Sequence, residues 1–332
     1  MGELQLIEKI KKRLSRHNSS SLICGIGDDC AIFKGDNKKW LISTDTLVEN
    51  KHFDLTFHAP FALGYKAFAV NLSDIAAMGG NPVFATMSFT VTEVVNDKWL
   101  DSFLDGICKI ISKYNLTLIG GDTVSGSEMS MTVTILGTAS HPIQRNGAGK
   151  GDAVYVSGHL GNSAGGLYLL QNAPGLIEKQ LHEPWHEPLL NAHLLPEPQI
   201  ELARLLAETE QVTAMQDISD GVATDLAHLV KASSVSATII EEDLPIGPEL
   251  VKLASVYRLS TTDLALLGGE DYQLLFTVNG DEKGQKALEV LVAGQGFSIK
   301  KIGFVNDGDG EVTLVKKDGG LENISFQGFE HS

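Results

Sequence analysis

Acidic residues recur beside glycines and short polar residues at predicted turns along most of the chain, and this pattern constrains the fold most strongly. Each of these acidic stations borders an apolar run, where a strand or helix ends and where binding sites are commonly built. Carboxylates that are brought together repel one another unless hard cations neutralise them. The pattern therefore predicts a site for several Mg²⁺ ions, a kind of site that usually serves phosphate chemistry. The stations are Gly27-Asp28-Asp29, Ser43-Thr44-Asp45-Thr46, Asn71-Leu72-Ser73-Asp74, Gly120-Gly121-Asp122-Thr123, Asp217-Ile218-Ser219-Asp220 and Gly268-Gly269-Glu270-Asp271.

Net charge and length restrict the class of protein. The formal net charge is −16, which argues against a nucleic-acid or anionic-membrane surface. A phosphorylated substrate would then need metal ions or a local basic group to approach. The 332 residues predict two domains, and the turn-rich segment 146–151 places the boundary between 1–148 and 149–332.

The cysteines and the N-terminus indicate an intracellular protein. Cys24, Cys30 and Cys108 are odd in number and lack zinc-site spacing, which argues against a disulfide framework. The first residues read as a charged amphipathic helix rather than a signal peptide, and no apolar run reaches membrane-spanning length. We therefore expect a cytoplasmic location.

Apolar periodicity predicts alternating helices and strands, which is typical of an α/β protein. Residues 173–198 are rich in proline and histidine and are expected to be irregular. The predicted helices cover 6–14, 61–78, 97–114, 163–170, 201–210, 220–233 and 281–293. The predicted strands cover 39–45, 83–93, 116–119, 129–139, 153–157, 237–240 and 272–278, and the C-terminal tail alternates strand and turn.

Residues His182 to His186 match the zinc-protease pattern HExxH. That motif requires a helical turn that places both imidazoles on one face, and Pro184 and Pro188 oppose such a helix. We interpret the segment as a surface loop and predict that it binds no stoichiometric zinc.

Most acidic stations, taken one at a time, also have an ordinary structural explanation. Ser-Asp pairs such as those at Asp74 and Asp220 commonly cap helices, and Asp45 and Asp122 suit turns at strand ends. Their joint occurrence, and the doubled Asp28-Asp29, make a shared metal site the better interpretation.

At these residues the chain resembles the bacterial thiamine-monophosphate kinases, a family within the superfamily of aminoimidazole ribonucleotide synthetase and selenophosphate synthetase. The similar stretches follow one another in order from residue 25 to residue 272. They are 25–31 (GIGDDCA), 43–48 (STDTLV) with His52 and Phe53, 64–67 (GYKA), 71–79 (NLSDIAAMG), 118–123 (LIGGDT), 217–221 (DISDG) and 268–272 (GGEDY).

The resemblance implies a two-domain α/β fold in which the N-terminal domains of two subunits pair into a shared β-barrel, so that the protein is a homodimer. It implies ATP and thiamine monophosphate as substrates, Mg²⁺ as cofactor, and an N-terminal domain that binds ATP and Mg²⁺. By resemblance the metal ligands are Asp29, Ser43, Thr44, Asp45, Asp74, Asp122, Asp217 and Asp220. The ATP contacts are Gly121, Asp122, Arg145 and Ser219, and the thiamine-phosphate contacts are His52, Glu270 and Phe326.

The implied reaction suits a carboxylate-rich site, because the attacking phosphate oxygen is already anionic and needs no general base. We expect Asp45→Asn and Asp122→Asn each to abolish turnover. Glu270→Gln is expected to raise KM for thiamine monophosphate and leave KM for ATP nearly unchanged. Another ATP-dependent synthetase of the superfamily, a metal-dependent phosphohydrolase and a non-catalytic nucleotide-binding module remain alternatives.

Overall fold

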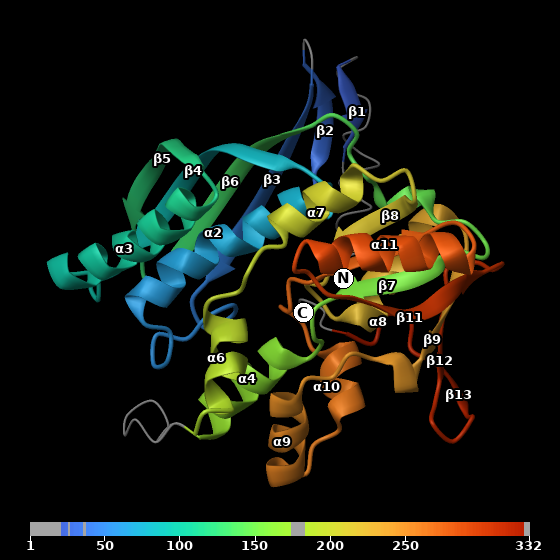
Figure 1. Cartoon of the computed structure of the whole chain (residues 1–332). Helices are drawn as coiled ribbons and strands as arrows, with labels where there is room; N and C mark the ends of the chain where they lie inside the picture. Colours follow the sequence, from blue (N-terminus) through green and yellow to red (C-terminus); the bar gives the residue numbers. More distant parts are fainter. Residues whose placement is uncertain (1–20, 26, 36–37, 174–182, 329–332) are drawn as a thin grey trace.

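The computed structural model describes residues 21–25, 27–35, 38–173 and 183–328, which form two β-sheets with helices packed on them (Figure 1). The first sheet has the strand order β1-β2-β3-β6-β4-β5, and the second has the order β13-β12-β9-β11-β7-β10-β8. Most neighbouring strands are antiparallel, whereas β4 with β5 and β9 with β12 are parallel. The two-domain α/β architecture expected from the sequence is confirmed.

The first sheet and its two helices use residues up to Ala139. Helices α2 and α3 pack on each other, and α2 lies against β3 and β6 (Figure 1). Strands β1 and β5 form the two edges, so the sheet is open. The elements are β1 (Leu22–Cys24), β2 (Ala31–Lys34), β3 (Lys39–Val48), α2 (Pro60–Ala77), β4 (Asn81–Val91), α3 (Asp97–Lys113), β5 (Thr117–Ser125) and β6 (Ser130–Ala139).

The remaining elements form the second sheet and the helices around it. Helix α8 contacts several strands of this sheet, and α11 contacts β11, while α4, α6, α9 and α10 form a helical group at one end (Figure 1). The elements are η2 (Arg145–Gly147), β7 (Ala153–Ser157), α4 (Asn162–Asn172), α6 (His186–Leu194), α7 (Ile200–Ala207), β8 (Val212–Asp217), α8 (Val222–Ser233), β9 (Ser236–Ile240), η3 (Glu241–Asp243), α9 (Pro248–Tyr257), α10 (Thr261–Leu267), β10 (Leu274–Val278), α11 (Glu282–Gly294), β11 (Ile299–Asn306), β12 (Val312–Val315) and β13 (Leu321–Asn323).

Strand β7 is buried on both faces because each face packs against a different core. Tyr155 faces the core that contains α2 and α11, and its ring stacks on that of Phe276 with centroids 5.7 Å apart. Val154 and Val156 face the core formed with α8. A strand covered on both sides reads as a continuous apolar run, as 153–157 does.

Helix α2 connects the two halves of the structure. It begins with Pro60 in its first turn, where the missing N–H costs no helical hydrogen bond, and it contacts β3, β6, α7 and β8. Because neighbours surround it, nearly all its residues are buried, including Lys66, Asn71 and Ser73. This helix therefore carries polar side chains to the junction of the two halves.

Most predicted elements are confirmed within a few residues, and three corrections concern the acidic stations. Strand β3 continues to Val48 and β5 to Ser125, so Asp45 and Asp122 lie within strands rather than at strand-end turns. Asp217 ends β8, which was not predicted, and the following helix begins at Val222 rather than at residue 220. The predicted helix 6–14 lies outside the described residues.

The prediction that 173–198 is irregular is wrong for its second half. Helix α6 begins at His186, two residues after Pro184, and Pro188 falls in its first turn. Proline is tolerated there because the N–H groups of the first turn have no partner within the helix. Helices α9 and α10 and the short strands β1 and β2 were not predicted either.

Candidate active site

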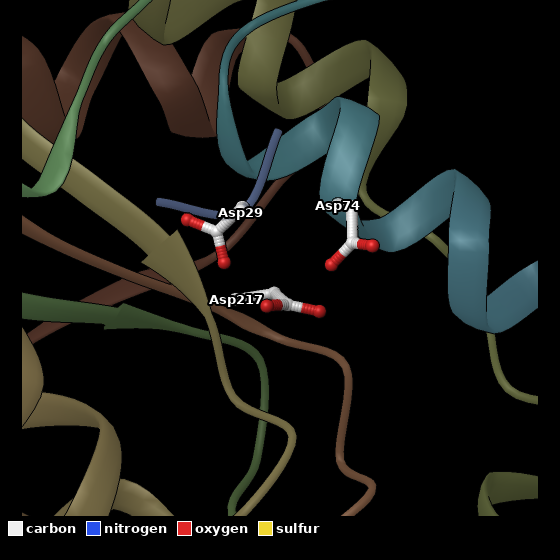
Figure 2. Close-up of side chains that lie close together, drawn as sticks. All are labelled: Asp29, Asp74 and Asp217. Carbon is white, nitrogen blue, oxygen red and sulfur yellow. The ribbon is translucent and has the colours of Figure 1, made fainter. Parts of the chain in front are cut away.

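Asp29, Asp74 and Asp217 point toward one another from three different elements (Figure 2). Asp29 lies in the loop before β2, Asp74 on α2, and Asp217 at the end of β8. One carboxylate oxygen from each lies within 4.8 Å of the others. The two sheets and the helix between them thus bring together three residues of the predicted metal set.

Arg145 holds the loop that carries Asp29. Its Nε and Nη2 donate to the two carboxylate oxygens of Asp29 at 3.1 and 2.6 Å, a bidentate pair. Its backbone N–H donates to Asp28 at 3.3 Å. Arg145 is itself anchored by Ser233 of α8, whose hydroxyl donates to the Arg145 carbonyl at 2.8 Å. The arginine predicted to contact ATP therefore lies beside a predicted metal ligand.

Residues of β3 and α2 place the next carboxylates. The Ser43 hydroxyl donates to Asp74, and the side-chain amide oxygen of Asn71 accepts from the backbone N–H of Asp45 at 2.9 Å. Asn71 and Asp74 lie three apart on α2 and so share one face of the helix. This pairing of strand and helix accounts for the positions of Ser43, Asp45 and Asp74 together.

The loop between β8 and α8 is held by two further polar residues. Ser73 of α2 donates its hydroxyl hydrogen to Asp217 at 2.5 Å. Asp225, in the first turn of α8, accepts from the backbone N–H groups of Ser219 and Asp220, both at 3.1 Å. Asp225 thus orients the loop on which the predicted ligand Asp220 and the predicted ATP contact Ser219 lie.

Burial and mutual repulsion make these carboxylates difficult to ionise. Burial, followed by the charge of Asp29, raises the pKa of Asp217 to about 8. Burial and the nearby Asp45 and Asp217 raise the pKa of Asp74 well above its usual range. Burial and the charge of Asp29 raise the pKa of Asp28 to about 6. Burial is the largest cause for all three groups, and the like charge of neighbouring carboxylates adds to it.

The donor set fits Mg²⁺. This ion prefers oxygen ligands, and most of the candidate ligands here are carboxylates. Arg145 balances one charge, but Asp29, Asp45, Asp74 and Asp217 together carry four when ionised. Cations bound among them would remove the repulsion that raises these pKa values, so the residues present suit the predicted ions.

A cavity of about 880 Å³ extends from this cluster to the helical group. Asp45, Asp74, Asp217, Ser219 and Asp220 line one part of it. His52 and Glu270, predicted to contact the thiamine phosphate, line the same cavity, together with Phe53, Phe57, His58, Leu167, Tyr168 and His193. One cavity therefore combines a carboxylate region with a partly aromatic region.

Asp29, Ser43 and Arg145 do not line this cavity but belong to the carboxylate cluster or contact it. Three other predicted site residues of the same chain lie elsewhere. The Thr44 hydroxyl lies on the open face of the first sheet, 2.9 Å from the Thr134 hydroxyl. Gly121 and Asp122 lie in β5, which is exposed along its whole length at the sheet edge. These two therefore stand apart from the carboxylate cluster of their own chain.

Phe326 lies at the rim, next to Gln327 and Gly328, which do line the cavity. Its ring meets that of His228 edge-on with centroids 5.1 Å apart, and the Lys231 ammonium lies 5.5 Å from the ring centroid. It is 39% exposed, so part of the ring is available to a ligand.

The HExxH match does not form one helix. His182 lies outside the described residues, Glu183 and Pro184 precede the helix, and the buried His186 begins it. The ring nitrogen Nδ1 of His186 accepts from the Glu183 backbone N–H at 3.0 Å. The expected surface loop is thus corrected to a helix start, and the absence of zinc remains a prediction.

Several buried residues of the site were not predicted. Lys66 comes from α2, and Asp225 follows the station 217–220. Asn71, Ser73 and Asp271 belong to acidic stations but were assigned no role in the site. For Lys66 a signal existed, because a lysine interrupts the apolar run 61–78. Asp225 gave no such signal, since an acidic residue in the first helical turn is ordinary.

Comparison with known protein families matches both halves of the chain. Residues 27–139 match the N-terminal domain of AIR synthase related proteins, and residues 149–316 match their C-terminal domain. The two matches together span most of the described residues.

Individual relatives are similar to this chain along nearly its whole length. The chain is 38% identical to a thiamine-monophosphate kinase of Salmonella typhimurium, over 99% of this chain and 98% of the relative. It is 34% identical to one of Bacillus subtilis, over 100% and 99%. A solved structure described as AaThiL complexed with AMPPCP and TMP superposes with a TM-score of 0.85 at 34% identity, covering 100% of this chain and 97% of that chain.

Proposed function

The chain belongs to the thiamine-monophosphate kinase family of AIR synthase related proteins, and we propose that it converts ATP and thiamine monophosphate to ADP and thiamine diphosphate. The protein is a kinase. The observation that carries the substrate assignment is the single cavity that joins the carboxylate cluster to His52 and Glu270. A related structure with AMPPCP and TMP supports the same pair of ligands.

The proposed reaction is a direct in-line transfer. An oxygen of the thiamine phosphate forms a bond to the γ-phosphorus of ATP, and the bond from that phosphorus to the β–γ bridging oxygen breaks, leaving ADP with the electron pair. The attacking oxygen is already anionic, so the chain needs no side chain to remove a proton. The work of the protein is to orient two polyanions and limit their repulsion.

We propose Asp29, Ser43, Thr44, Asp45, Asp74, Asp122, Asp217 and Asp220 as the residues that hold Mg²⁺. When bound, these ions would neutralise the phosphates of both substrates and the developing charge of the transition state. The chain prepares the site by fixing the carboxylates: Arg145 orients Asp29, Ser43 orients Asp74, and Ser73 orients Asp217. The Thr44 hydroxyl faces Thr134 on the other side of β3 from the carboxylates. Thr44 would therefore contact an ion through its main-chain atoms.

For ATP we propose contacts from Gly121, Asp122, Arg145 and Ser219. Arg145 and Ser219 lie beside the carboxylate cluster. Gly121 and Asp122 stand apart from it in their own chain, and they would reach a nucleotide if β5 of a second subunit lay across the cavity mouth.

A homodimer with a shared barrel is therefore part of the proposal. The open edge strand β5 supports it, because such an edge offers unpaired N–H and C=O groups to another chain. Leu118, Ile119 and Val124 of β5 are exposed, although large apolar side chains are normally covered. Pairing of two such sheets would bury them.

Two further assignments complete the proposal. We place the domain boundary between residues 148 and 149, because the strands of the first sheet end at Ala139 and those of the second begin at Ala153. The proposed compartment is the cytoplasm, which suits three cysteines that form no disulfide. No described helix is long and apolar enough to cross a bilayer.

Incubation of the protein with Mg-ATP and thiamine monophosphate, with chromatographic analysis of products, tests the function. Equal amounts of ADP and thiamine diphosphate are expected. Omission of Mg²⁺ should stop the reaction, and thiamine should not replace its monophosphate. Release of inorganic phosphate without thiamine diphosphate would instead identify a phosphohydrolase. Absence of both products would favour another synthetase of the superfamily.

A further inference from the structure

Beneath the cavity, a buried lysine and a buried histidine contact the same carboxylate oxygen. The ammonium Nζ of Lys66 lies 3.0 Å from Oε2 of Glu270, and Nδ1 of His193 lies 3.2 Å from that oxygen. Lys66 is 0% exposed and comes from α2, His193 comes from α6, and Glu270 is 27% exposed in the cavity wall. Among the described residues, Oε1 of Glu270 has no such partner. Oε1 is therefore the carboxylate oxygen that remains available to accept a hydrogen bond from a ligand.

The backbone around Glu270 is also held in an uncommon conformation. Glu270 and Tyr272 have positive φ angles of 64° and 48°, which side chains with a Cβ rarely adopt. Hydrogen bonds fix both residues to the β8–α8 connection: the Glu270 N–H donates to Ser219 O at 2.7 Å, and the Tyr272 N–H to Ile218 O at 2.9 Å. Strained residues persist only where their surroundings determine them, and they gather at ligand sites.

Asp271 fixes the other side of this loop. Its buried carboxylate accepts from the backbone N–H groups of Gly161 and Ser163 at 2.6 and 3.0 Å, at the start of α4. The segment that carries Glu270 is therefore fastened to the β8–α8 connection, to α4 and, through the Lys66 contact, to α2. So many attachments leave the carboxylate little freedom to seek another position.

Stability alone does not explain Lys66. Removing an ammonium group from water costs several kcal/mol, and replacing buried ion pairs by apolar residues is often neutral or stabilising. On α2 the helix-face neighbours of Lys66 include the buried Leu63 and Val70, and a methionine of similar length suits such surroundings. A charged residue in that place is better explained by what it does to Glu270.

His193 is a neutral neighbour of the same carboxylate oxygen. Burial, then the charge of Lys66, lowers the pKa of His193 well below its usual range. Its Nδ1 makes a hydrogen bond of 3.1 Å with the Ser163 hydroxyl and lies 3.2 Å from Oε2 of Glu270. The imidazole therefore packs a polar, uncharged group against that oxygen. Because Ser163 and Glu270 share this one nitrogen, the three residues do not form a nucleophile–base–acid relay.

We propose that Lys66 and His193 are positioning residues that hold Oε2 of Glu270 and so present Oε1 to the cavity as the acceptor for the phosphoryl-accepting substrate. The group recognised carries N–H donors or a positive charge, as an aminopyrimidine or a thiazolium ring does. This inference rests on the proposed function and adds two specificity residues to it. Without them Glu270 would keep its charge but could turn toward solvent.

A double-mutant cycle tests the assignment, with Lys66→Met, Glu270→Gln and the combined variant. Each single change should raise KM for thiamine monophosphate about tenfold or more, with kcat and KM for ATP changed less than about twofold. If Lys66 acts through Glu270, the combined variant should bind thiamine monophosphate no worse than Glu270→Gln alone. Calorimetric titration with thiamine monophosphate gives the same comparison without turnover.

Two further sets of variants separate positioning from folding. His193→Asn keeps a nitrogen near the place of Nδ1 and should retain most of the affinity, whereas His193→Leu should lose about tenfold. Lys113→Met removes an exposed ion pair with Glu197, neither of which lines the cavity, and should change neither KM. If Lys66→Met does not fold, the two His193 variants still decide the assignment.

The outcomes distinguish this inference from the proposed function. A wild-type protein that neither binds nor phosphorylates thiamine monophosphate would overturn the proposed function, and this assignment with it. Normal wild-type turnover with an unchanged KM in Lys66→Met and His193→Leu would overturn the assignment alone. The assignment would also be overturned if the increases in KM caused by Lys66→Met and Glu270→Gln multiply in the combined variant, because the two residues would then act separately.

Discussion

Two kinds of neighbour hold the carboxylates of the site. Arg145 pairs with Asp29 through two hydrogen bonds, whereas Asp74 and Asp217 accept from the neutral hydroxyls of Ser43 and Ser73. A hydroxyl orients a carboxylate without neutralising it. Asp74 and Asp217 therefore keep the capacity to bind cations, and the predictions for single residues follow from this.

Asp45→Asn is expected to lower kcat by at least about a hundredfold, because the proposed metal site would lose a charged ligand while the strand keeps its shape. The Asp45 backbone N–H would still donate to Asn71, so the melting temperature should stay within a few degrees. Asp101→Asn, an exposed change on α3, serves as the matched control. Near-normal turnover of Asp45→Asn at saturating Mg²⁺ would remove this residue from the ligand set.

The metal-free protein should lose stability as pH rises. Asp217 has a folded pKa of about 8 against an ordinary value of 3.8, so the folded state keeps a proton that the unfolded chain releases. This contribution is fully present below pH 3.8 and is lost as pH rises through about 8. Asp74, whose pKa is also raised, acts in the same direction.

Melting temperatures of chelator-treated protein between about pH 5 and about pH 8 test this prediction. Mg²⁺ binds ionised carboxylates, so its stabilising effect should be larger at the upper end. Asp217→Asn should flatten the pH dependence, which separates the site from the general effect of the net charge of −16. A melting temperature that rises with pH in the metal-free wild type would contradict the assigned direction.

At the scale of elements, the connection from β8 to α8 depends on a cap formed within the first turn of the helix. Asp225 accepts from the N–H groups of Ser219 and Asp220, which no strand or helix satisfies. Burial raises the pKa of Asp225 well above its usual range, so its surroundings accommodate a neutral group. The cap therefore needs an oxygen acceptor more than it needs a charge.

We expect Asp225→Ala to reduce the free energy of unfolding by about 2 kcal/mol, because two partly buried N–H groups lose their acceptor. Asp225→Asn keeps an oxygen and should lose less than half as much. Denaturant titrations measure both, and Mg²⁺ titrations should show weaker binding in the alanine variant, since Asp220 lies on the same connection. Equal losses in the two variants would show that the charge, not the acceptor, matters.

At the scale of the whole molecule, the separation of Asp122 from the carboxylate cluster requires an explanation. Asp122 lies on the exposed edge strand β5, and Asp45 lines the cavity. If β5 of one subunit completes the site of its partner, the two residues act in one site while belonging to two chains. Inactive variants at the two positions should then complement each other.

Asp45→Asn and Asp122→Asn are each expected to be inactive as homodimers. In randomly mixed dimers about half are heterodimers, and each has one site with both aspartates, so about a quarter of wild-type activity should return. Mixing after denaturation and refolding, with activity measured against unmixed controls, checks this. If a mixture that contains heterodimers recovers no activity, Asp122 belongs to the site of its own chain or lies outside any site.

The sequence by itself determined most of the elements and indicated a site rich in carboxylates. Apolar periodicity identified helices such as α2 and α3, because the burial of one face is a local pattern. The acidic stations predicted the carboxylates that meet at Asp29, Asp74 and Asp217, because turn residues beside apolar runs mark the ends of elements. The ends of β3 and β5 were predicted less well and β8 was not predicted, since strand formation depends on pairing with distant strands.

Only the tertiary structure decided which residues share a site and which support it. Lys66 and Glu270 are 204 positions apart, and nothing in the local pattern of either predicts their contact. Packing of α2 against both halves buries the ammonium, and a buried charge must find a partner wherever the fold provides one. For the same reason Asp122, which resembles the other acidic stations in sequence, is left on an exposed edge. Its neighbours are set by the order of strands in the sheet.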